Sequence, residues 1–396
     1  MKKHFFKRAP GSLVAFLKTE SASGVVLGIC AVVAMLLANS PISSSYFDIL
    51  HAKVLGLSIQ HWINDGLMTI FFFVIGMEIK KEILVGELSS LRKAALPIAA
   101  AIGGMVVPAL IYFSFNSKAP NSNGWGIPMA TDIAFALGVL TLFGKRVPLS
   151  LKIFLLALAI VDDLGAVLVI ALFYTKQINI LGLGLAAFSF AVILVGRKLG
   201  TRSYYYYLAL GAVAWFGFLY SGVHATVAGV ILGLMTPFKI EYGTSLIDSY
   251  SPLEELIHKL HPLVSFGIMP IFALANAGIS IRGVELGPMV SNPIHLGILF
   301  GLLIGKPVGI TLFSYLAVRL GLGQLPENLK WKHIIGVAFL GGIGFTMALF
   351  ISGLALSPEQ EIFSKTGIML ASVIAALLGS VVLTSAFKRQ ECKIIH

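Results

Sequence analysis

Long apolar runs separated by short polar loops constrain the fold of this chain most strongly. A helix needs about 20 apolar residues to cross the hydrocarbon core of a bilayer, and several of these runs are nearer 15 residues. Only 12% of the residues are charged, against about 25% in soluble proteins. The sequence therefore predicts an all-α polytopic membrane protein, with one integral domain over residues 1–396 and some short or broken helices. We count about twelve runs, at residues 13–38, 59–79, 94–115, 124–143, 149–174, 181–195, 204–219, 223–235, 256–279, 294–316, 333–356 and 362–387.

The net charge of +11 is better explained by membrane topology than by nucleic-acid binding, because Lys and Arg lie in the short loops. An even number of spans places both termini on one side and assigns every loop to a side. Of the 29 Lys and Arg residues, 22 then lie on the inner side and two, Lys18 and Lys306, lie within the runs. The other five lie on the outer side: Lys53, Lys118, Lys176, Arg282 and Lys365. Since cytoplasmic loops carry the excess of Lys and Arg, we expect twelve spans and cytoplasmic termini.

No small-residue cleavage site follows the first run, so we expect this run to be a retained first span and not a cleaved signal peptide. Cys30 and Cys392 are too few and too far apart to suggest a disulfide framework.

Glycine and proline interrupt two of the runs. "GWGIPMATDIAFALG" (124–138) lies in the fourth run, and "GVAFLGGIGFTMALF" (336–350) lies in the eleventh, with a helix break expected at Gly341, Gly342 and Gly344. Each interrupted run is the middle member of a triplet, and the triplets are offset by an odd number of spans, so they cross the membrane in opposite senses. This arrangement predicts an inverted-topology repeat with halves at about 94–174 and 294–387, two discontinuous helices and a binding site at the breaks.

Four ionisable residues fall deep inside the runs, where each costs about 2.5 to 3.5 kcal/mol on insertion scales. Asp162 and Asp163 are adjacent in "AIVDDLGAV", Asp132 follows Thr131 in "MATDIAFAL", and Lys306 lies in "GLLIGKPVGITLF". Lys306 is about 18 Å from the start of its run, too deep to reach the interface easily. Asp132 is either a helix N-cap or a counter-charge for half-helix dipoles, and in a broken helix the two roles coincide.

Adjacent helical residues diverge by about 100°, so one acid of the Asp pair can face Lys306 while the other faces a cavity. Such a coupled pair holds either protons or a hard cation that prefers oxygen ligands, which permits exchange by competition. The simpler alternative for the Asp pair is a structural ion pair without a role in transport.

Two other functions remain open for the chain as a whole. An intramembrane aspartyl protease would be identified by proteolysis of a membrane substrate, and a cation channel by single-channel currents. No ATP-binding motif and no cofactor are indicated.

Motifs along nearly the whole chain resemble those of the bacterial NhaA sodium/proton antiporters. They are "ATDIAFALGVL", "AIVDDLGAVLVIALFY", "SGVHATVAG", "LHP", "FALANAGIS", "IGKPVGI" and "GGIGFTMALFI", in the order of the family. The resemblance implies electrogenic, pH-regulated export of cytoplasmic Na⁺ or Li⁺ in exchange for external protons, by alternating access in the bacterial inner membrane. It implies Asp163 as the principal carboxylate, Asp162 as the second acid with Lys306 as its partner, and Thr131 and Asp132 at the helix break.

The resemblance also implies a pH response at the cytoplasmic side. The matching residues here are Glu78 and Glu82 at the end of the second run, and Glu255, His258 and His261 around the start of the ninth. The family carries Glu directly before the first His, whereas this chain has Ile257. A short two-stranded ribbon is possible in "HAKVLGLSIQHW" (51–62), as in members that form homodimers through it.

Overall fold

The structure, a computed structural model of the chain, describes residues 10–175, 178–201, 204–238, 240–241, 249–281, 286–326 and 328–391. The basic segment before residue 10, Lys176, Arg282 and Cys392 lie outside these residues. Helices up to the Asp pair are α1 (Pro10–Ala38), α2 (Ser43–His51), α3 (Ile59–His61), α4 (Met68–Val85), α5 (Leu91–Phe115), α6 (Ile133–Thr141) and α7 (Leu149–Phe173). Those that follow are α8 (Ile180–Lys198), α9 (Tyr204–Ser221), α10 (Thr226–Met235), α11 (Pro252–Leu263), α12 (Met269–Asn276), α13 (Leu286–Ser291), α14 (Pro293–Phe300), α15 (Lys306–Arg319), α16 (Trp331–Gly341), α17 (Phe345–Ala355) and α18 (Pro358–Glu391).

Six further helical segments depart from α geometry. Three are 3₁₀-helices, namely η2 (Glu87–Ser89), η3 (Asn121–Met129) and η4 (Gly144–Arg146). Three are π-helices, namely η1 (Trp62–Leu67), η5 (Val264–Ile268) and η6 (Gly301–Gly305), each continuous with α-helix on both sides. Because π-helical turns are rare and concentrate at functional sites, their positions identify regions of interest.

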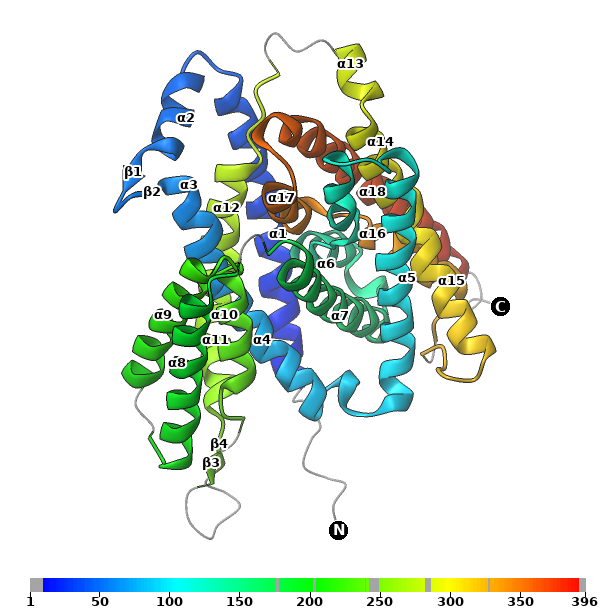
Figure 1. Cartoon of the computed structure of the whole chain (residues 1–396). Helices are drawn as coiled ribbons and strands as arrows, with labels where there is room; N and C mark the ends of the chain where they lie inside the picture. The colour runs from blue at the N-terminus through cyan, green and yellow to red at the C-terminus, as the bar shows by residue number, and fades with distance from the viewer. Residues whose placement is uncertain are drawn as a thin grey trace.

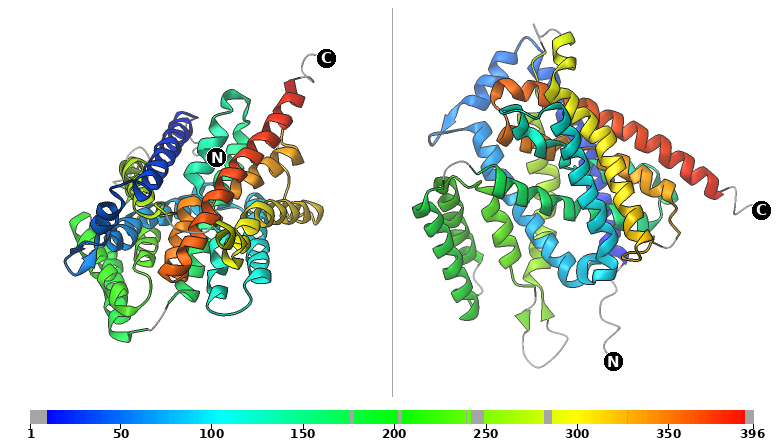
Figure 2. Two further views of the ribbon diagram at one scale, coloured as in Figure 1. Left: turned by 90° about the horizontal axis from the view of Figure 1, so that it is seen from above. Right: turned by 45° about the vertical axis from the view of Figure 1, so that its right-hand side comes forward.

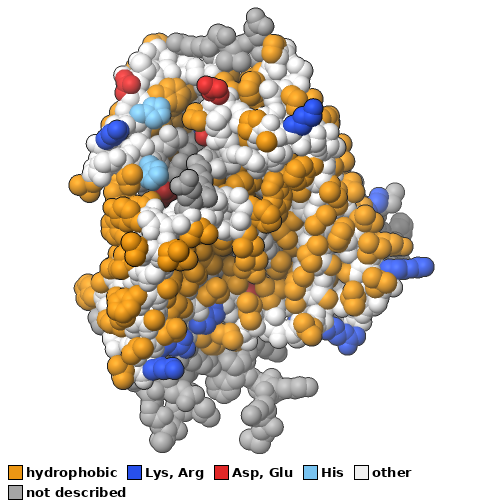
Figure 3. Space-filling model, in the orientation of Figure 1, with side chains coloured by type: hydrophobic (Ala, Val, Ile, Leu, Met, Phe, Trp, Pro, Cys, Tyr) orange, Lys and Arg blue, Asp and Glu red, His pale blue; other side chains and the backbone are white. Residues whose placement is uncertain are grey.

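Each apolar run of the sequence contains a helix, and the all-α membrane fold is confirmed. By length and composition, seven helical segments of the described chain are able to cross a membrane, or up to nine if each of two bent helix pairs is one span. The remaining runs coincide with α3, η1 and α4 (59–79), with α9 (204–219) and with α10 (223–235). Hydrophobic side chains cover much of the middle of this face, and Lys and Arg side chains lie near its upper, lower and right-hand edges (Figure 3). Exposed apolar residues such as Leu110, Leu172 and Phe188 are therefore lipid-facing.

The helices form two groups joined by α1 (Figures 1 and 2). In one group α8, α9 and α10 pack together and α10 packs on α4. In the other, α5 packs on α7 and α15, and α18 packs on α14, α16 and α17. Helix α1 contacts α6 of the second group and α12 of the first. The largest hydrophobic core lies where these elements meet, and a smaller one, around Trp215 and Phe218, lies between α8, α9 and α10.

Glycines bring α5 and α15 into backbone contact. A Cβ atom added to Gly103 or Gly309 would meet the carbonyl oxygen of the other residue, and Gly305 lies directly against Pro108. Small residues allow membrane helices to approach in this way. The close approach fixes the depth and rotation of α15, and therefore of Lys306, its first residue.

Two small hairpins lie toward opposite ends of the molecule (Figure 1). Strands β1 (Lys53–Val54) and β2 (Leu57–Ser58) pair antiparallel, with Lys53 opposite Ser58, so the ribbon expected in 51–62 is present. Leu55 and Gly56 both have positive φ, as a tight two-residue turn requires. Strands β3 (Ile240–Glu241) and β4 (Ser249–Tyr250) pair antiparallel as the second hairpin, at the bottom of the view in Figure 1.

Candidate functional site

Two discontinuous helices meet in the interior of the second helix group, where the Gly and Pro pattern placed them. The first comprises η3, the extended residues around Ala130 and Thr131, and α6. The second comprises α16 and α17, bent by 44° at the break between Gly341 and Phe345. Gly342 caps α16 and Gly344 precedes α17. Both breaks are buried, so their backbone groups must find partners inside the protein.

Asp132 supplies partners at both breaks. Its Oδ1 accepts a hydrogen bond from the Phe135 N–H at 3.0 Å, which makes it the N-cap of α6. Its Oδ2 accepts from the Thr346 N–H at 3.1 Å and from the Thr346 hydroxyl at 2.5 Å, in the first turn of α17. Its own N–H donates to the Ile343 carbonyl at 2.7 Å. One carboxylate therefore faces the positive ends of two half-helices.

Lys306 joins the Asp pair to the first break. Its Nζ donates to Asp162 Oδ2 at 2.5 Å and to Thr131 Oγ1 at 2.8 Å, and the Thr131 hydroxyl donates to the Gly341 carbonyl at 2.8 Å. The side chains of Lys306 and Asp162 are 1% and 2% exposed. The π-helix η6 ends at Gly305, directly before Lys306, and so contributes to the direction in which this side chain leaves the helix.

Asp163 lies next to this pair and is not held by it. The residue is 2% exposed, and its Oδ2 has no hydrogen-bond partner. It interacts electrostatically with the charges of Asp162, Asp132, Glu78 and Lys306. Asp162 Oδ1 likewise has no hydrogen-bond partner. Buried carboxylate oxygens without a donor are what a proton or a hard cation with oxygen ligands would satisfy.

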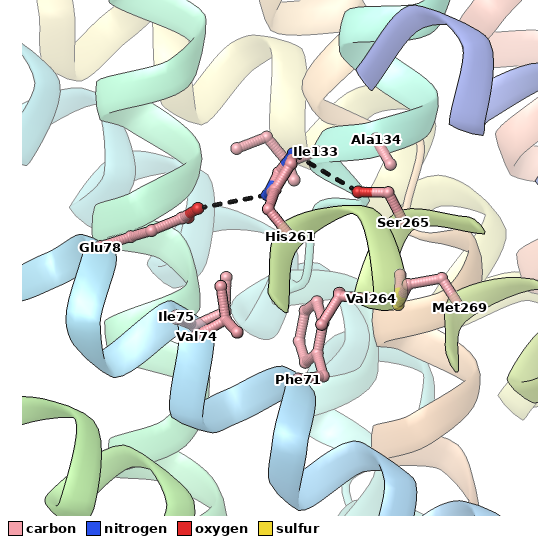
Figure 4. Close-up of a pocket in the computed structure, with 10 residues that line it drawn as sticks. All are labelled: Phe71, Val74, Ile75, Glu78, Ile133, Ala134, His261, Val264, Ser265 and Met269. Atoms are coloured by element: carbon pink, nitrogen blue, oxygen red, sulfur yellow. Dashed lines mark hydrogen bonds and ion pairs between the residues drawn. The ribbon is translucent and has the colours of Figure 1, made fainter. Parts of the chain in front are cut away.

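A small pocket, with a cavity volume of about 30 Å³, lies between α4, α11, η5 and the start of α6 (Figure 4). His261 Nδ1 lies 3.6 Å from Glu78 Oε1, and its Nε2 lies 3.4 Å from the Ser265 hydroxyl. Ile133, the residue after Asp132, lines the same pocket. Two of the predicted pH-response residues, Glu78 and His261, are therefore neighbours in a pocket that Ile133 also lines.

The other predicted pH-response residues lie elsewhere. Glu82 is buried and its Oε2 accepts from the Glu87 N–H at 2.8 Å, across the turn after α4. Glu255 pairs with Lys259 on the same helix turn. His258 is exposed on α11. Glu78 and His261 thus share the pocket, whereas His258, three positions before His261 on the same helix, is exposed.

The sequence reasoning missed two hydroxyl groups at the second break. Thr346 binds Asp132 as described, and Ser372 of α18 accepts a hydrogen bond from the Phe345 N–H at 3.3 Å. Thr346 belongs to the motif "GGIGFTMALFI" and lies two residues after Gly344 of the predicted break. A polar residue at that position could therefore have been identified as a candidate site residue. Ser372 lies in an apolar run, and nothing in its sequence context relates it to α17.

A protein-family model described as "Na+/H+ antiporter 1" matches residues 14–383. The chain is 52% identical to "Na(+)/H(+) antiporter NhaA 2" of Pseudomonas syringae pv. syringae (strain B728a), over 94% of this chain and 94% of that protein. It is 50% identical to "Na(+)/H(+) antiporter NhaA" of Vibrio alginolyticus, over 92% of this chain and 94% of the relative. "Na(+)/H(+) antiporter NhaA 1" of Clostridium beijerinckii (strain ATCC 51743 / NCIMB 8052) is 48% identical, over 99% of this chain and 100% of the relative.

Proposed function

Since this chain belongs to the Na⁺/H⁺ antiporter 1 family and is a Na⁺/H⁺ antiporter, we propose that Asp163 and Asp162 are the carboxylates that bind the exchanged ions. The protein is a multi-pass membrane transporter and not an enzyme, which sets aside the intramembrane protease. The observation that carries the proposal is the buried Asp163 Oδ2 without a hydrogen-bond partner, beside the Asp162–Lys306 pair.

Exchange follows from competition for the same oxygens. A cation at the Asp pair takes the unpartnered oxygens of Asp163 and Asp162, and a proton on Asp163 removes the negative charge that holds the cation. Protons arriving from one side therefore release a cation bound from the other. Oxygen donors suit Na⁺ and Li⁺, and no cofactor takes part.

Lys306 neutralises Asp162 while the cation is absent. Its ammonium group occupies Asp162 Oδ2 and is also held by Thr131, so a cation that uses both oxygens of Asp162 must displace it. Thr131 and Asp132 keep the two half-helix ends in place around this exchange. Net movement of charge in such a cycle makes transport sensitive to membrane potential.

Alternating access is the mode of transport that this architecture favours. The two triplets, residues about 94–174 and 294–387, each contain a discontinuous helix as the middle member, as inverted repeats of transporters do. The Lys and Arg distribution supports cytoplasmic termini, and the bacterial relatives support the inner membrane as the location. Na⁺ then leaves the cytoplasm as external protons enter. A bent, fully packed site suits occlusion better than the open pore of a cation channel.

Glu78 and His261 are candidates for pH regulation. Protonation of His261 gives it a positive charge that strengthens its pairing with Glu78 across the pocket, and deprotonation weakens the pairing. Rising pH therefore loosens α11 from α4 at the pocket mouth. The β1–β2 hairpin, with Leu55 fully outside, is a candidate surface for a homodimer.

Fluorescence dequenching in everted vesicles tests the ion site directly. A preformed pH gradient should collapse on addition of Na⁺ or Li⁺ and not of K⁺ for the wild type, and the response should vanish in Asp163→Asn. Asp48→Asn, on the exposed side of α2, is the matched control and should keep the wild-type response. Wild-type activity in Asp163→Asn from pH 6 to 9 would refute the assignment.

A further inference from the structure

The N-terminal half of the first discontinuous helix, η3, is a nine-residue 3₁₀-helix. Because 3₁₀ hydrogen bonds have poorer geometry than those of the α-helix, runs longer than three to four residues are uncommon. A 3₁₀ segment of this length inside a membrane protein therefore needs partners from neighbouring helices. Two tyrosine hydroxyl groups supply them.

Tyr112 and Tyr174 both bind the backbone of η3. The Tyr112 hydroxyl donates to the Asn121 carbonyl at 2.7 Å. The Tyr174 hydroxyl donates to the Asn123 carbonyl at 2.8 Å and accepts from the Gly126 N–H at 3.2 Å. Both rings are buried, with exposed fractions of 0% and 7%.

Two glycines make room for these hydroxyls. A Cβ atom added to Gly124 would run into the Tyr112 hydroxyl, and one added to Gly126 would lie 2.6 Å from the Tyr174 hydroxyl. The spacing "GWG" therefore fits the two tyrosines, and it places Trp125 between them against Phe113 and Phe173. The glycines and the tyrosines act as one contact between η3 and its neighbours.

The tyrosines come from the helices that frame the ion site. Tyr112 lies near the end of α5, which packs on α15 and hence on the Lys306 side, and Tyr174 caps the end of α7, the helix of Asp162 and Asp163. η3 ends at Met129, immediately before the segment that carries Thr131 and Asp132. The position of η3 is thus transmitted to the break through a very short stretch of chain.

We propose that Tyr112 and Tyr174 are positioning residues for cation binding, because their hydroxyls fix η3 to α5 and α7 and so hold Thr131 and Asp132 in register with the Asp pair. The tyrosines do not touch the ions. This inference rests on the proposed exchange at Asp163. It requires that loosening η3 weakens binding of the cation more than it slows the turnover of the bound protein.

Substitution by Phe keeps the ring and removes only the hydroxyl. One lost hydrogen bond of this kind typically changes an equilibrium constant by about two- to tenfold. We therefore expect Tyr174→Phe, which removes two hydrogen bonds, to raise the half-saturating Na⁺ concentration about tenfold and Tyr112→Phe somewhat less, with the maximal rate within about twofold of the wild type.

Tyr206→Phe is the matched control. Its hydroxyl donates to the Val192 carbonyl at 2.6 Å and lies against Gly196, between α8 and α9 and away from the ion site. It reproduces the tyrosine, carbonyl and glycine arrangement without contact to η3. Its half-saturating Na⁺ concentration should equal that of the wild type.

The experiment measures Na⁺ titrations of dequenching in everted vesicles for the wild type, the three Phe variants and Asp163→Asn, at equal amounts of membrane protein. Loss of the response in Asp163→Asn establishes the proposed function independently of the tyrosines. A raised half-saturating concentration in Tyr112→Phe and Tyr174→Phe alone supports the inference. An unchanged half-saturating concentration, or an equal rise in Tyr206→Phe, overturns it. If a Phe variant fails to reach the membrane, Gly126→Ala, which displaces the Tyr174 hydroxyl, is judged by the same criteria.

Discussion

Lys306 and Asp162 are a buried ion pair whose two members cannot be removed independently. Transfer of each charge from water into the protein interior costs several kcal/mol, and their attraction together with the Thr131 hydroxyl offsets that cost. Removing one member leaves the other charge buried without compensation. Replacing both members leaves two neutral side chains, which can hydrogen-bond to each other or pack together without a buried charge.

Single and double substitutions of this pair therefore should differ in a characteristic way. We expect Asp162→Asn and Lys306→Gln each to lower stability by about 3 kcal/mol, and the double variant to regain most of that loss. Thermal unfolding of the purified protein in one detergent, at one pH, measures the effect. Destabilisation that simply adds in the double variant would show that the two side chains are energetically independent.

Thr346 offers a second test at the residue scale, because its hydroxyl binds the carboxylate that caps both half-helices. Thr346→Val keeps the shape of a fully buried side chain and loses the hydrogen bond to Asp132, so we expect a loss of about 1 to 3 kcal/mol. Thr346→Ser, which keeps the hydroxyl, should lose less than the Val variant.

Thr384→Val is the control for this comparison. Its hydroxyl is exposed on α18 and donates to the Ser380 carbonyl of the same helix at 2.8 Å. Its unfolding midpoint should match the wild type. Thr346→Val with a wild-type midpoint would mean that the Thr346 N–H alone is enough for Asp132 Oδ2.

At the scale of elements, the helix breaks were predictable and their detailed geometry was not. Gly and Pro at 124–138 and Gly341 to Gly344 interrupt helices through local backbone preferences, which a sequence displays directly. The 3₁₀ geometry of η3 and the π-turn of η6 depend instead on partners from other helices, such as Tyr174 and Pro108. Such partners are distant in sequence, so no local pattern indicates them.

The contact between α5 and α15 allows a prediction for a whole helix pair. Gly309→Ala places a methyl group against the Gly103 carbonyl, so the helices must separate at a point one turn from Lys306. We expect a loss of about 1 to 3 kcal/mol in thermal unfolding, with reduced Na⁺-driven dequenching. Gly184→Ala on α8, where no atom lies within 4 Å of the added carbon, should be neutral or slightly stabilising. Equal effects at both positions would contradict the role of close packing.

For the whole molecule, hydropathy alone predicted the helices and their order, because a bilayer demands long apolar helices whatever they pack against. The grouping of charges depended on tertiary structure. Asp162 rather than Asp163 meets Lys306, and Glu78 meets His261 while His258 points to solvent, although both histidines lie on α11. A rotation of one residue along a helix decides such contacts. The helical pattern alone left open which acid faces Lys306, and only the family resemblance implied that it is Asp162.

Thiol accessibility tests the orientation of the molecule and of its pocket together. The pocket near Glu78 should open to the cytoplasm and the β1–β2 hairpin to the opposite side, where Leu55 is 89% exposed. In a background with Cys30→Ser and Cys392→Ser, we expect His258→Cys, at an exposed position of α11, to react with a membrane-impermeant maleimide in everted vesicles only. Leu55→Cys should react in right-side-out vesicles only.

The two thiols control for each other, since both are read in the same two vesicle preparations. His258 is exposed on α11, the helix that also carries His261 of the pocket, so a reagent in solution reaches it directly. Reaction of both thiols from one side would refute the assignment of the hairpin and the pocket to opposite sides. Reaction of His258→Cys in right-side-out vesicles alone would reverse the assigned topology, and with it the direction in which Na⁺ is expected to leave.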